Sequence, residues 1–299
     1  MCVKSHHFLQ LIALSALWGA SFLFLRIASP VLGPQVLATG RVLLACLVLL
    51  WLMRQLKQVW PGREHAWPLL WLGVSTVALP FWLFSWAALR LPAGYSALLN
   101  ATAVLFGTLA AAAVGEQRLS VGKVLGCVLG FMGVGLIVRL GPVEPNASTI
   151  AAALACVAAA ACYGISGPFI KRHTARMEPL ALATALHLGA LLVMLPGGLW
   201  TLPEARWTPG ALASMAVLGV VTSGLGYWMH LRMMRHVSSV AALSSAFMIP
   251  VFGVTWGHVF LNEPLSGGIF VGGLLVLVAM ALVTGFNPLR RPAPLEPLP

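Results

Sequence analysis

The sequence predicts an all-α integral membrane protein whose ten transmembrane helices form two inverted five-helix repeats. Three observations lead to this fold class: the composition, a duplicated pattern of residues and the distribution of positive charge. Charged residues make up 8% of the 299 residues, and apolar residues make up 60%. A soluble domain of this size has too little interior to bury so much apolar surface, so lipid must be the solvent.

The clearest span lies at residues 240–261, which contain no charged side chain. These 22 residues, at about 1.5 Å each, can cross a hydrocarbon core of roughly 30 Å. Residues 262–264 (NEP) then supply a turn, an acid and a helix breaker. A weaker copy lies 147 residues earlier, where Gly115 and Glu116 match the first two residues of that loop. This match is the first sign of duplication.

The first half, residues 8–140, is expected to hold five spans. The first span ends at Arg26, and Pro30 and Pro34 bracket a short loop before the second. Arg41 lies about two turns inside the second span, where a full positive charge is costly. The expected spans are residues 8–25, 34–53, 67–89, 92–114 and 121–138.

The second half, residues 149–286, follows a short polar stretch (GPVEPNAS) that is typical of a linker. Its expected spans are residues 149–170, 180–200, 209–234, 240–261 and 267–286. At an offset of 145, several polar, aromatic and proline positions of the halves coincide. The matched pairs are Trp18 with Tyr163, Ser21 with Ser166, Arg26 with Lys171, Pro34 with Pro179, and Trp82 with Tyr227.

Glycines indicate how the fifth and tenth spans pack. The fifth contains Gly122, Gly126 and Gly130 at four-residue spacing, which is typical of helices that approach closely. Gly268 and Gly272 occupy the corresponding places in the tenth span. If the chain forms a homodimer, we expect it to form through these two helices.

Positive charge predicts the orientation. With a cytoplasmic N-terminus, thirteen Lys and Arg residues fall on the inner side and four on the outer side, with Arg41 inside the membrane. This bias follows the positive-inside rule, so we expect a multi-pass protein of the inner (plasma) membrane with both termini cytoplasmic. Because five is an odd number, the second repeat must enter from the opposite side. Inverted repeats of this kind occur in many secondary transporters.

Two stretches carry a resemblance to a known family. They are LWGASFLFLR at residues 17–26 and IPVFGVTWGHVFLNEPLS at residues 249–266. With the five-plus-five layout, the chain resembles the EamA-type permeases of the drug/metabolite transporter superfamily. The resemblance implies a membrane carrier, commonly an exporter of amino acids, related metabolites or drug-like compounds. The sequence departs from the family at Ala103, where a proline is missing, so we expect the fourth helix to be straighter than its partner in the second half.

Candidate substrate-binding residues come from the matched aromatic and polar positions within the spans. Arg41 could contact an anionic group of a substrate, or could instead snorkel and hold its own helix. His230 could relay protons or could pack through a hydrogen bond, and the aromatic residues could line a cavity or anchor the interface. The candidates are Trp18, Ser21, Arg41, Trp82, Trp86, Asn100, Tyr163, Ser166, Tyr227 and His230.

The sequence lacks the residues that a proton relay or an enzyme would need. The chain contains no Asp, and no Glu lies within an expected span, so a carboxylate proton relay at the midplane has no candidate. The HExxH, GxSxG and P-loop patterns are absent, so we expect no enzyme, catalytic residue, metal or cofactor. The net charge of +11 resides mainly in loops between spans, so we expect no nucleic-acid partner.

The favoured function is secondary active transport of a small metabolite by alternating access, with export the expected direction. The expected partners are therefore a small-molecule substrate and the lipid bilayer. The alternative is a non-transporting scaffold or accessory subunit that uses the glycines of the fifth and tenth helices as its partner surface. Polar and aromatic residues that face a common interior would favour the carrier.

Overall fold

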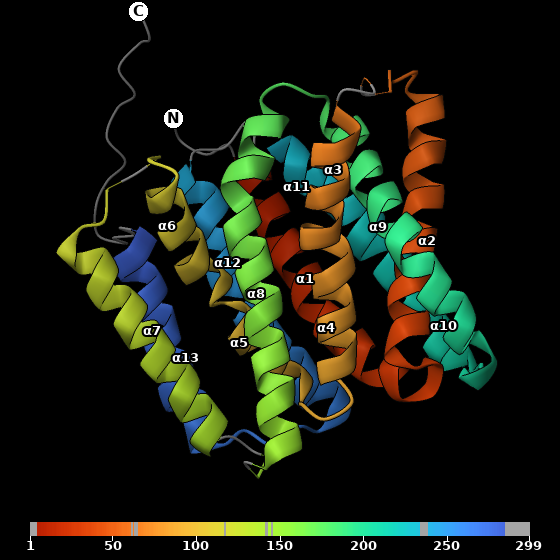
Figure 1. Ribbon diagram of the computed structural model, residues 1–299. Coiled ribbons are helices and arrows are strands. Elements are labelled where there is room, and N and C mark those ends of the chain that lie inside the picture. Colours follow the sequence, from red (N-terminus) through yellow and green to blue (C-terminus); the bar gives the residue numbers. More distant parts are fainter. Residues whose placement is uncertain are drawn as a thin grey trace, which may run out of the picture.

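The computed structural model describes residues 5–60, 62, 65–116, 118–140, 143–144, 146–233 and 239–284. Within these ranges every regular element is helical (Figure 1). Seven helical stretches are long and apolar enough to cross a membrane, and shorter apolar helices at residues 121–137, 248–261 and 267–283 bring the described total to ten. The predicted all-α membrane fold is confirmed.

The first half contains two continuous helices, then two interrupted spans, then one more continuous helix. The third span consists of three consecutive segments, and the fourth consists of two. In chain order the elements are α1 (Ser5–Leu32), α2 (Pro34–Gln55), α3 (Ala66–Gly73), a π-helical segment η2 (Val74–Ala78), α4 (Leu79–Ala87), α5 (Ala93–Asn100), α6 (Ala103–Ala113) and α7 (Val121–Leu140).

The second half also has a π-helical segment in its third span, but its fourth span is one continuous helix. The expected ends of the eighth and tenth spans, at residues 234 and 286, lie outside the described residues. The elements are α8 (Ala147–Thr174), α9 (Pro179–Thr201), a 3-10 turn η3 (Leu202–Glu204), α10 (Pro209–Ala216), a π-helical segment η4 (Val217–Leu225), α11 (Gly226–Met233), α12 (Ser239–Leu261) and α13 (Gly267–Thr284).

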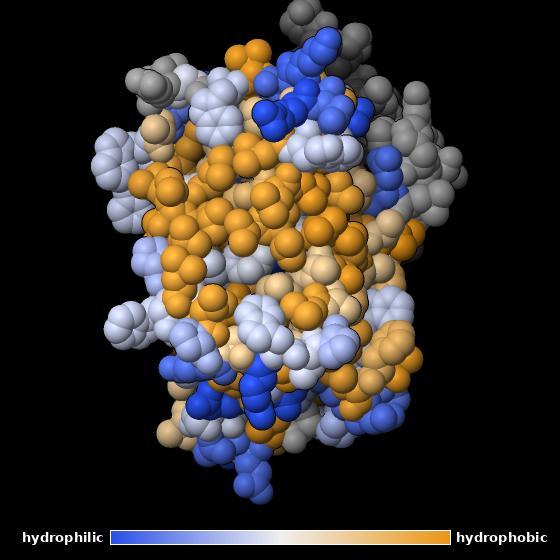
Figure 2. Space-filling model, turned by 90° about the vertical axis from the view of Figure 1, so that its right-hand side faces the viewer, coloured by the Kyte–Doolittle hydropathy of each residue, from blue (hydrophilic) through white to orange (hydrophobic). Residues whose placement is uncertain are grey.

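The surface has the polarity of a protein surrounded by lipid. Figure 2 shows a band of apolar side chains across the middle of one face, between two polar ends. Large apolar side chains such as Leu192, Leu274 and Phe260 are exposed. Exposed tryptophans include Trp67 and Trp200, and this residue is enriched where protein meets the membrane–water interface.

The first helix is longer than predicted. It continues past Arg26 and through Pro30 to Leu32, so the expected end at Arg26 is wrong. Arginine is compatible with a helix interior, and the Arg26 guanidinium donates a hydrogen bond of 2.7 Å to the carbonyl oxygen of Ala88, which directly follows α4. The turn into α2 instead needs only Gly33, whose positive φ of 78° costs a glycine little.

The fourth span is also not as predicted. It lacks the family's proline, yet it breaks between α5 and α6, whereas its partner α12 runs continuously through Pro250. At the break, the amides of Ala101 and Thr102 bond to carbonyls three residues back, and the Thr102 hydroxyl donates 2.7 Å to the Leu99 carbonyl. These local bonds compete with helical ones, so a threonine interrupts the helix without a proline.

The α7 and α13 helices lie side by side at one edge of the bundle (Figure 1). A Cβ added at Gly126 would lie 2.7 Å from Cγ2 of Val283, and one at Gly272 would lie 2.7 Å from the Gly133 carbonyl oxygen. The predicted close packing is therefore confirmed, but it occurs within one chain. Gly126 and Gly272 therefore pack within one chain and offer no surface to a second copy. Other faces of these helices carry exposed apolar residues such as Leu125 and Phe270, and a homodimer through the two helices stays a prediction.

Candidate functional site

A cavity of about 300 Å³ lies inside the bundle, and both halves line it. The first half contributes α1, α2, η2, α4 and the region around the break in the fourth span, and the second half contributes α8, η4, α11 and α12. The lining residues are Trp18, Ser21, Phe22, Leu25, Arg41, Thr76, Phe81, Phe84, Asn100, Ala101, Ala103, Val104, Tyr163, Gly167, Ile170, Thr222, Tyr227, His230, Leu231 and Ile249.

Arg41 supplies the cavity's charge. Its side chain is 6% exposed, and its Nε donates a hydrogen bond of 2.6 Å to the Ser223 hydroxyl. Its Nη2 donates one of 3.3 Å to the Thr222 hydroxyl. The guanidinium carbon lies 3.7 Å from the centroid of the Phe81 ring, within the range of a cation–π interaction. Arg41 is therefore fixed by neutral partners, and it does not snorkel to the membrane surface.

A π-helical segment of the second half positions these partners. Thr222 and Ser223 are consecutive residues of η4, and both reach Arg41. The Thr222 carbonyl also accepts a hydrogen bond of 3.3 Å from the Trp18 indole of α1. A π-helical segment adds a residue to a helical turn and so rotates the residues that follow it. Such segments are frequent at functional sites.

The third span of each half contains a π-helical segment at the matched place. At the offset of 145, residues 74–78 of η2 correspond to residues 219–223, which lie within η4. Each segment presents a threonine to the cavity, Thr76 from the first half and Thr222 from the second. The duplication seen in sequence is thus repeated in an uncommon backbone feature.

Aromatic rings form much of the cavity wall. The Phe84 ring stacks on Tyr163 at 6.2 Å, and the Trp18 ring meets His230 edge-on at 4.9 Å. His187 lies behind the wall and packs edge-on against Tyr227 at 5.1 Å, and its Nδ1 bonds to the Ala183 carbonyl at 2.8 Å. The first matched aromatic pair, Trp18 and Tyr163, therefore lines one cavity, as the repeat pattern predicts.

Asn100 is the last residue of α5, directly before the break in the fourth span. Its Oδ1 atom is buried at the cavity and has no hydrogen-bond partner among the described residues. A buried amide oxygen without a donor is costly. The break thus leaves an acceptor available to whatever occupies the cavity.

Seven of the ten predicted residues line the cavity, and Trp82, Trp86 and Ser166 do not. Trp82 is 36% exposed, whereas Phe81 and Phe84 face inward. Successive helical residues are about 100° apart, so Trp82 points away when its neighbour Phe81 points in. The prediction that Trp82 meets Tyr227 in the cavity is therefore wrong.

The other two residues lie behind the wall. The Trp86 ring is beneath the Arg90 guanidinium at 5.1 Å and packs against the core. The Ser166 hydroxyl donates a hydrogen bond of 2.9 Å to the Ser75 hydroxyl and so joins α8 to η2. Ser166 thus joins two spans and Trp86 packs against the core, and neither lines the cavity.

Sequence reasoning missed several lining residues, including Phe22, Phe81, Phe84 and the two threonines. Thr76 and Thr222 could have been found, because two threonines recur at nearly the repeat offset in the same span of each half. The phenylalanines gave no such signal, since nothing in an apolar helix distinguishes a ring that faces a cavity from one that faces lipid.

The matched glutamates join different elements at the two ends of the molecule. Asn262 ends α12 with a positive φ of 52°, and the Glu263 carboxylate then accepts hydrogen bonds of 2.6 Å and 3.1 Å from the amides of Ala93 and Gly94. These amides begin α5, where the helix dipole favours a negative charge. Glu263 therefore connects the second half to the first.

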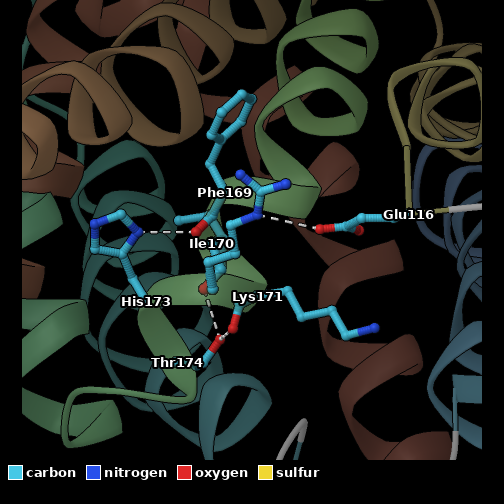
Figure 3. A network of polar contacts seen from close by, with 7 residues as sticks. Glu116, Phe169, Ile170, Lys171, His173 and Thr174 are labelled. Carbon is cyan, nitrogen blue, oxygen red and sulfur yellow. Dashed lines mark hydrogen bonds and ion pairs between the residues drawn. The ribbon is translucent and has the colours of Figure 1, made fainter. Parts of the chain in front are cut away.

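In the first half, Gly115 has a positive φ of 76° and ends the helix before Glu116. The Glu116 carboxylate lies 3.3 Å from Nε of Arg172, near the end of α8 (Figure 3). Both side chains are partly exposed, so this pair is screened by water and contributes little to stability. In both halves a residue with positive φ ends the helix just before the glutamate. Glu263 then binds backbone amides, whereas Glu116 pairs with an arginine side chain.

The described residues form ten apolar helices, and side chains from both halves line one ligand-sized cavity, which is typical of membrane carriers. The chain belongs to the EamA-like transporter family, which matches residues 8–139 and 150–285. The two matched regions give the chain duplicated halves. The protein is thus a multi-pass membrane transporter and not an enzyme.

Three relatives are informative. The uncharacterized transporter YvbV of Bacillus subtilis is 27% identical over 94% of this chain and 92% of its own length. The probable terminal-alkyne amino-acid exporter of Streptantibioticus cattleyicolor is 26% identical over 67% of each chain. One solved crystal structure has a TM-score of 0.69 at 16% identity and covers 93% of this chain and 98% of its own, which supports the fold.

Proposed function

We propose that this protein is a secondary active transporter that exports small metabolites, such as amino acids or drug-like compounds, by alternating access. In this mechanism the five-helix units at residues 8–140 and 149–286 move relative to each other around a substrate held between them. The observation that carries the proposal is the shared cavity, because both halves contribute side chains to one ligand-sized space. Any relative motion of the halves must reshape it.

The chemistry of the lining supports a small organic substrate. A volume of about 300 Å³ is at the lower end of the range for small-molecule sites. Such sites are mostly apolar with a few oriented polar groups. Here the aromatic wall supplies the apolar surface, and Arg41, Thr76 and Asn100 supply polar groups. The similarity to a probable amino-acid exporter supports export and an amino-acid-like substrate.

The alternative of a non-transporting scaffold has less support. It required the glycines of the fifth and tenth helices as a partner surface, and Gly126 and Gly272 instead pack α7 against α13. A scaffold also has no use for a buried arginine beside a cavity, which is costly to maintain.

The charge bias supports a location in the inner (plasma) membrane with both termini in the cytoplasm. We expect a membrane-impermeant thiol reagent, added to intact cells, to label Glu144→Cys but not Lys57→Cys, each on a cysteine-free background. Glu144 is exposed in the segment between the two halves, which the charge bias places outside. Lys57 follows the end of α2, which the charge bias places in the cytoplasm. Labelling of Lys57→Cys alone would reverse the orientation.

The proposed function is tested by transport in reconstituted vesicles. Purified protein should move at least one compound of a panel of amino acids, organic acids and aromatic amines faster than protein-free vesicles, with saturation. A denatured sample carried through the same reconstitution controls for leak. Protein that reconstitutes in folded form but moves no member of the panel would favour the scaffold.

A further inference from the structure

We propose that the substrate is an amphipathic organic acid, with one carboxylate bound by Arg41 and an apolar body held against the aromatic wall. This inference rests on the proposed function, and it names the chemical class that the cavity accepts. It follows from three features of the site: an uncompensated charge, an available edge of the guanidinium and the character of the remaining lining.

The charge of Arg41 has no acidic partner in the membrane. The chain has no Asp, and its seven acidic residues, all Glu, lie outside the spans expected from the sequence. Among the described residues the guanidinium contacts only two hydroxyls and a phenyl ring, which are neutral. A buried charge without a counter-charge is costly, and that cost falls when an anion enters the cavity. The missing counter-charge is therefore best supplied by the substrate.

The geometry leaves the guanidinium able to bind that anion through two donors. Of its five N–H groups, Nε donates to Ser223 and one Nη2 hydrogen donates to Thr222. Both Nη1 hydrogens and the second Nη2 hydrogen have no acceptor among the described residues. A carboxylate can bind the end of a guanidinium in two parallel hydrogen bonds, one from an Nη1 hydrogen and one from an Nη2 hydrogen. The two hydroxyls thus hold Arg41 in the cavity lining and leave guanidinium N–H donors without a protein acceptor among the described residues.

The rest of the lining selects an organic acid over a small inorganic anion. Phe22, Phe84 and Tyr163 offer apolar and aromatic surface that a hydrated ion cannot use. The amide of Asn100 supplies a hydrogen-bond group at another point of the same cavity. An apolar body with one carboxylate and a hydrogen-bonding substituent, as in an apolar amino acid, satisfies all of these groups.

The test compares acids with their neutral amides. Calorimetric titration of the purified protein should use 3-phenylpropanoate with 3-phenylpropanamide, phenylalanine with phenylalaninamide, and inorganic phosphate. We expect each acid to bind about 10- to 100-fold more tightly than its amide, because charge-assisted bonds to arginine are lost in the amide. In Arg41→Gln this preference should disappear, whereas in Arg206→Gln, an exposed arginine outside the cavity, it should remain.

The melting temperature of an Arg41 variant distinguishes a role in substrate binding from a role in folding. Arg41→Met removes the uncompensated charge and keeps an apolar stem, so we expect the ligand-free variant to melt at or above the temperature of the native protein. A lower melting temperature of Arg41→Met would assign the residue a structural role and overturn the inference. So would acid binding that is unchanged in Arg41→Gln.

Transport of the same compounds distinguishes the two proposals. Movement of amines or neutral compounds, with no acid bound or moved, would overturn the carboxylate inference and leave the transporter proposal standing. Phosphate binding that exceeds binding of every organic acid would make the site an inorganic-anion site and also overturn the inference. Failure of every compound to move would count against the transporter proposal itself.

Discussion

Leucine at Gly133 will separate α7 from α13 and reduce the free energy of unfolding by about 3 kcal/mol, the upper end of the usual cost of overpacking. A Cβ at this position would lie 2.8 Å from the Gly272 carbonyl oxygen and 3.0 Å from Cγ2 of Val276. The nearest atom belongs to backbone, which cannot rotate away, so the helices must move apart. Thermal unfolding of the purified variant, together with its yield from membranes, measures the effect.

Gly135 gives a matched control two residues further along α7. A Cβ there meets no atom within 4 Å, so Gly135→Leu should leave the melting temperature unchanged or raise it slightly, because leucine favours helix more than glycine does. Equal losses in both variants would mean that insertion of the helix, and not its packing on α13, is disturbed. An unchanged Gly133→Leu would show that the glycine face is not the contact.

Composition and apolar run length predicted every described span, because ten stretches of apolar residues bounded by charged or turn residues leave few alternatives in lipid. The ends were predicted less well. A charged residue after an apolar run, such as Arg26, usually marks the end of a membrane span. Here the guanidinium instead donates a hydrogen bond to the Ala88 carbonyl on a neighbouring span. Such a contact between distant parts of the chain has no local signature.

The interruptions within spans explain most of the remaining differences. The break at residues 101–102 depends on a threonine hydroxyl that bonds to a nearby carbonyl, and threonine is common in unbroken membrane helices as well. The π-helical segments at residues 74–78 and 217–225 add residues to a turn, which rotates everything that follows. The segment η2 has 5 residues and η4 has 9, so the matched positions that follow them need not face the same way. Tyr227 lines the cavity, whereas Trp82 is exposed.

The repeat was the strongest guide to the candidate site. Trp18 and Tyr163 were selected because they match, and both line the cavity. Arg41 was selected because charge inside a span is rare, and it lies at the cavity as well. What the sequence could not supply is the partner set of Arg41, because Thr222 and Ser223 lie more than 180 residues away along the chain.

Removing the ring of Tyr227 will impair transport far more than it impairs folding. Tyr227 lines the cavity and is the part of the wall against which His187 packs. Tyr227→Leu keeps apolar bulk in the wall but removes the aromatic face and the hydroxyl. We expect apparent substrate affinity in reconstituted vesicles to fall about 10- to 100-fold, because an aromatic contact and a few kcal/mol of apolar burial by the substrate are lost together.

Trp82→Leu is the control, because Trp82 occupies the matched position of the first half but is exposed at the outer surface of the bundle. It should transport as the native protein does, since lipid replaces its contacts. The repeat alone would predict equal effects at Trp82 and Tyr227, whereas the register shift of the π-helical segments predicts unequal ones. Equal loss of transport in both variants, with unchanged melting temperatures, would therefore contradict the cavity as described. It would mean that Trp82 also lines the substrate cavity.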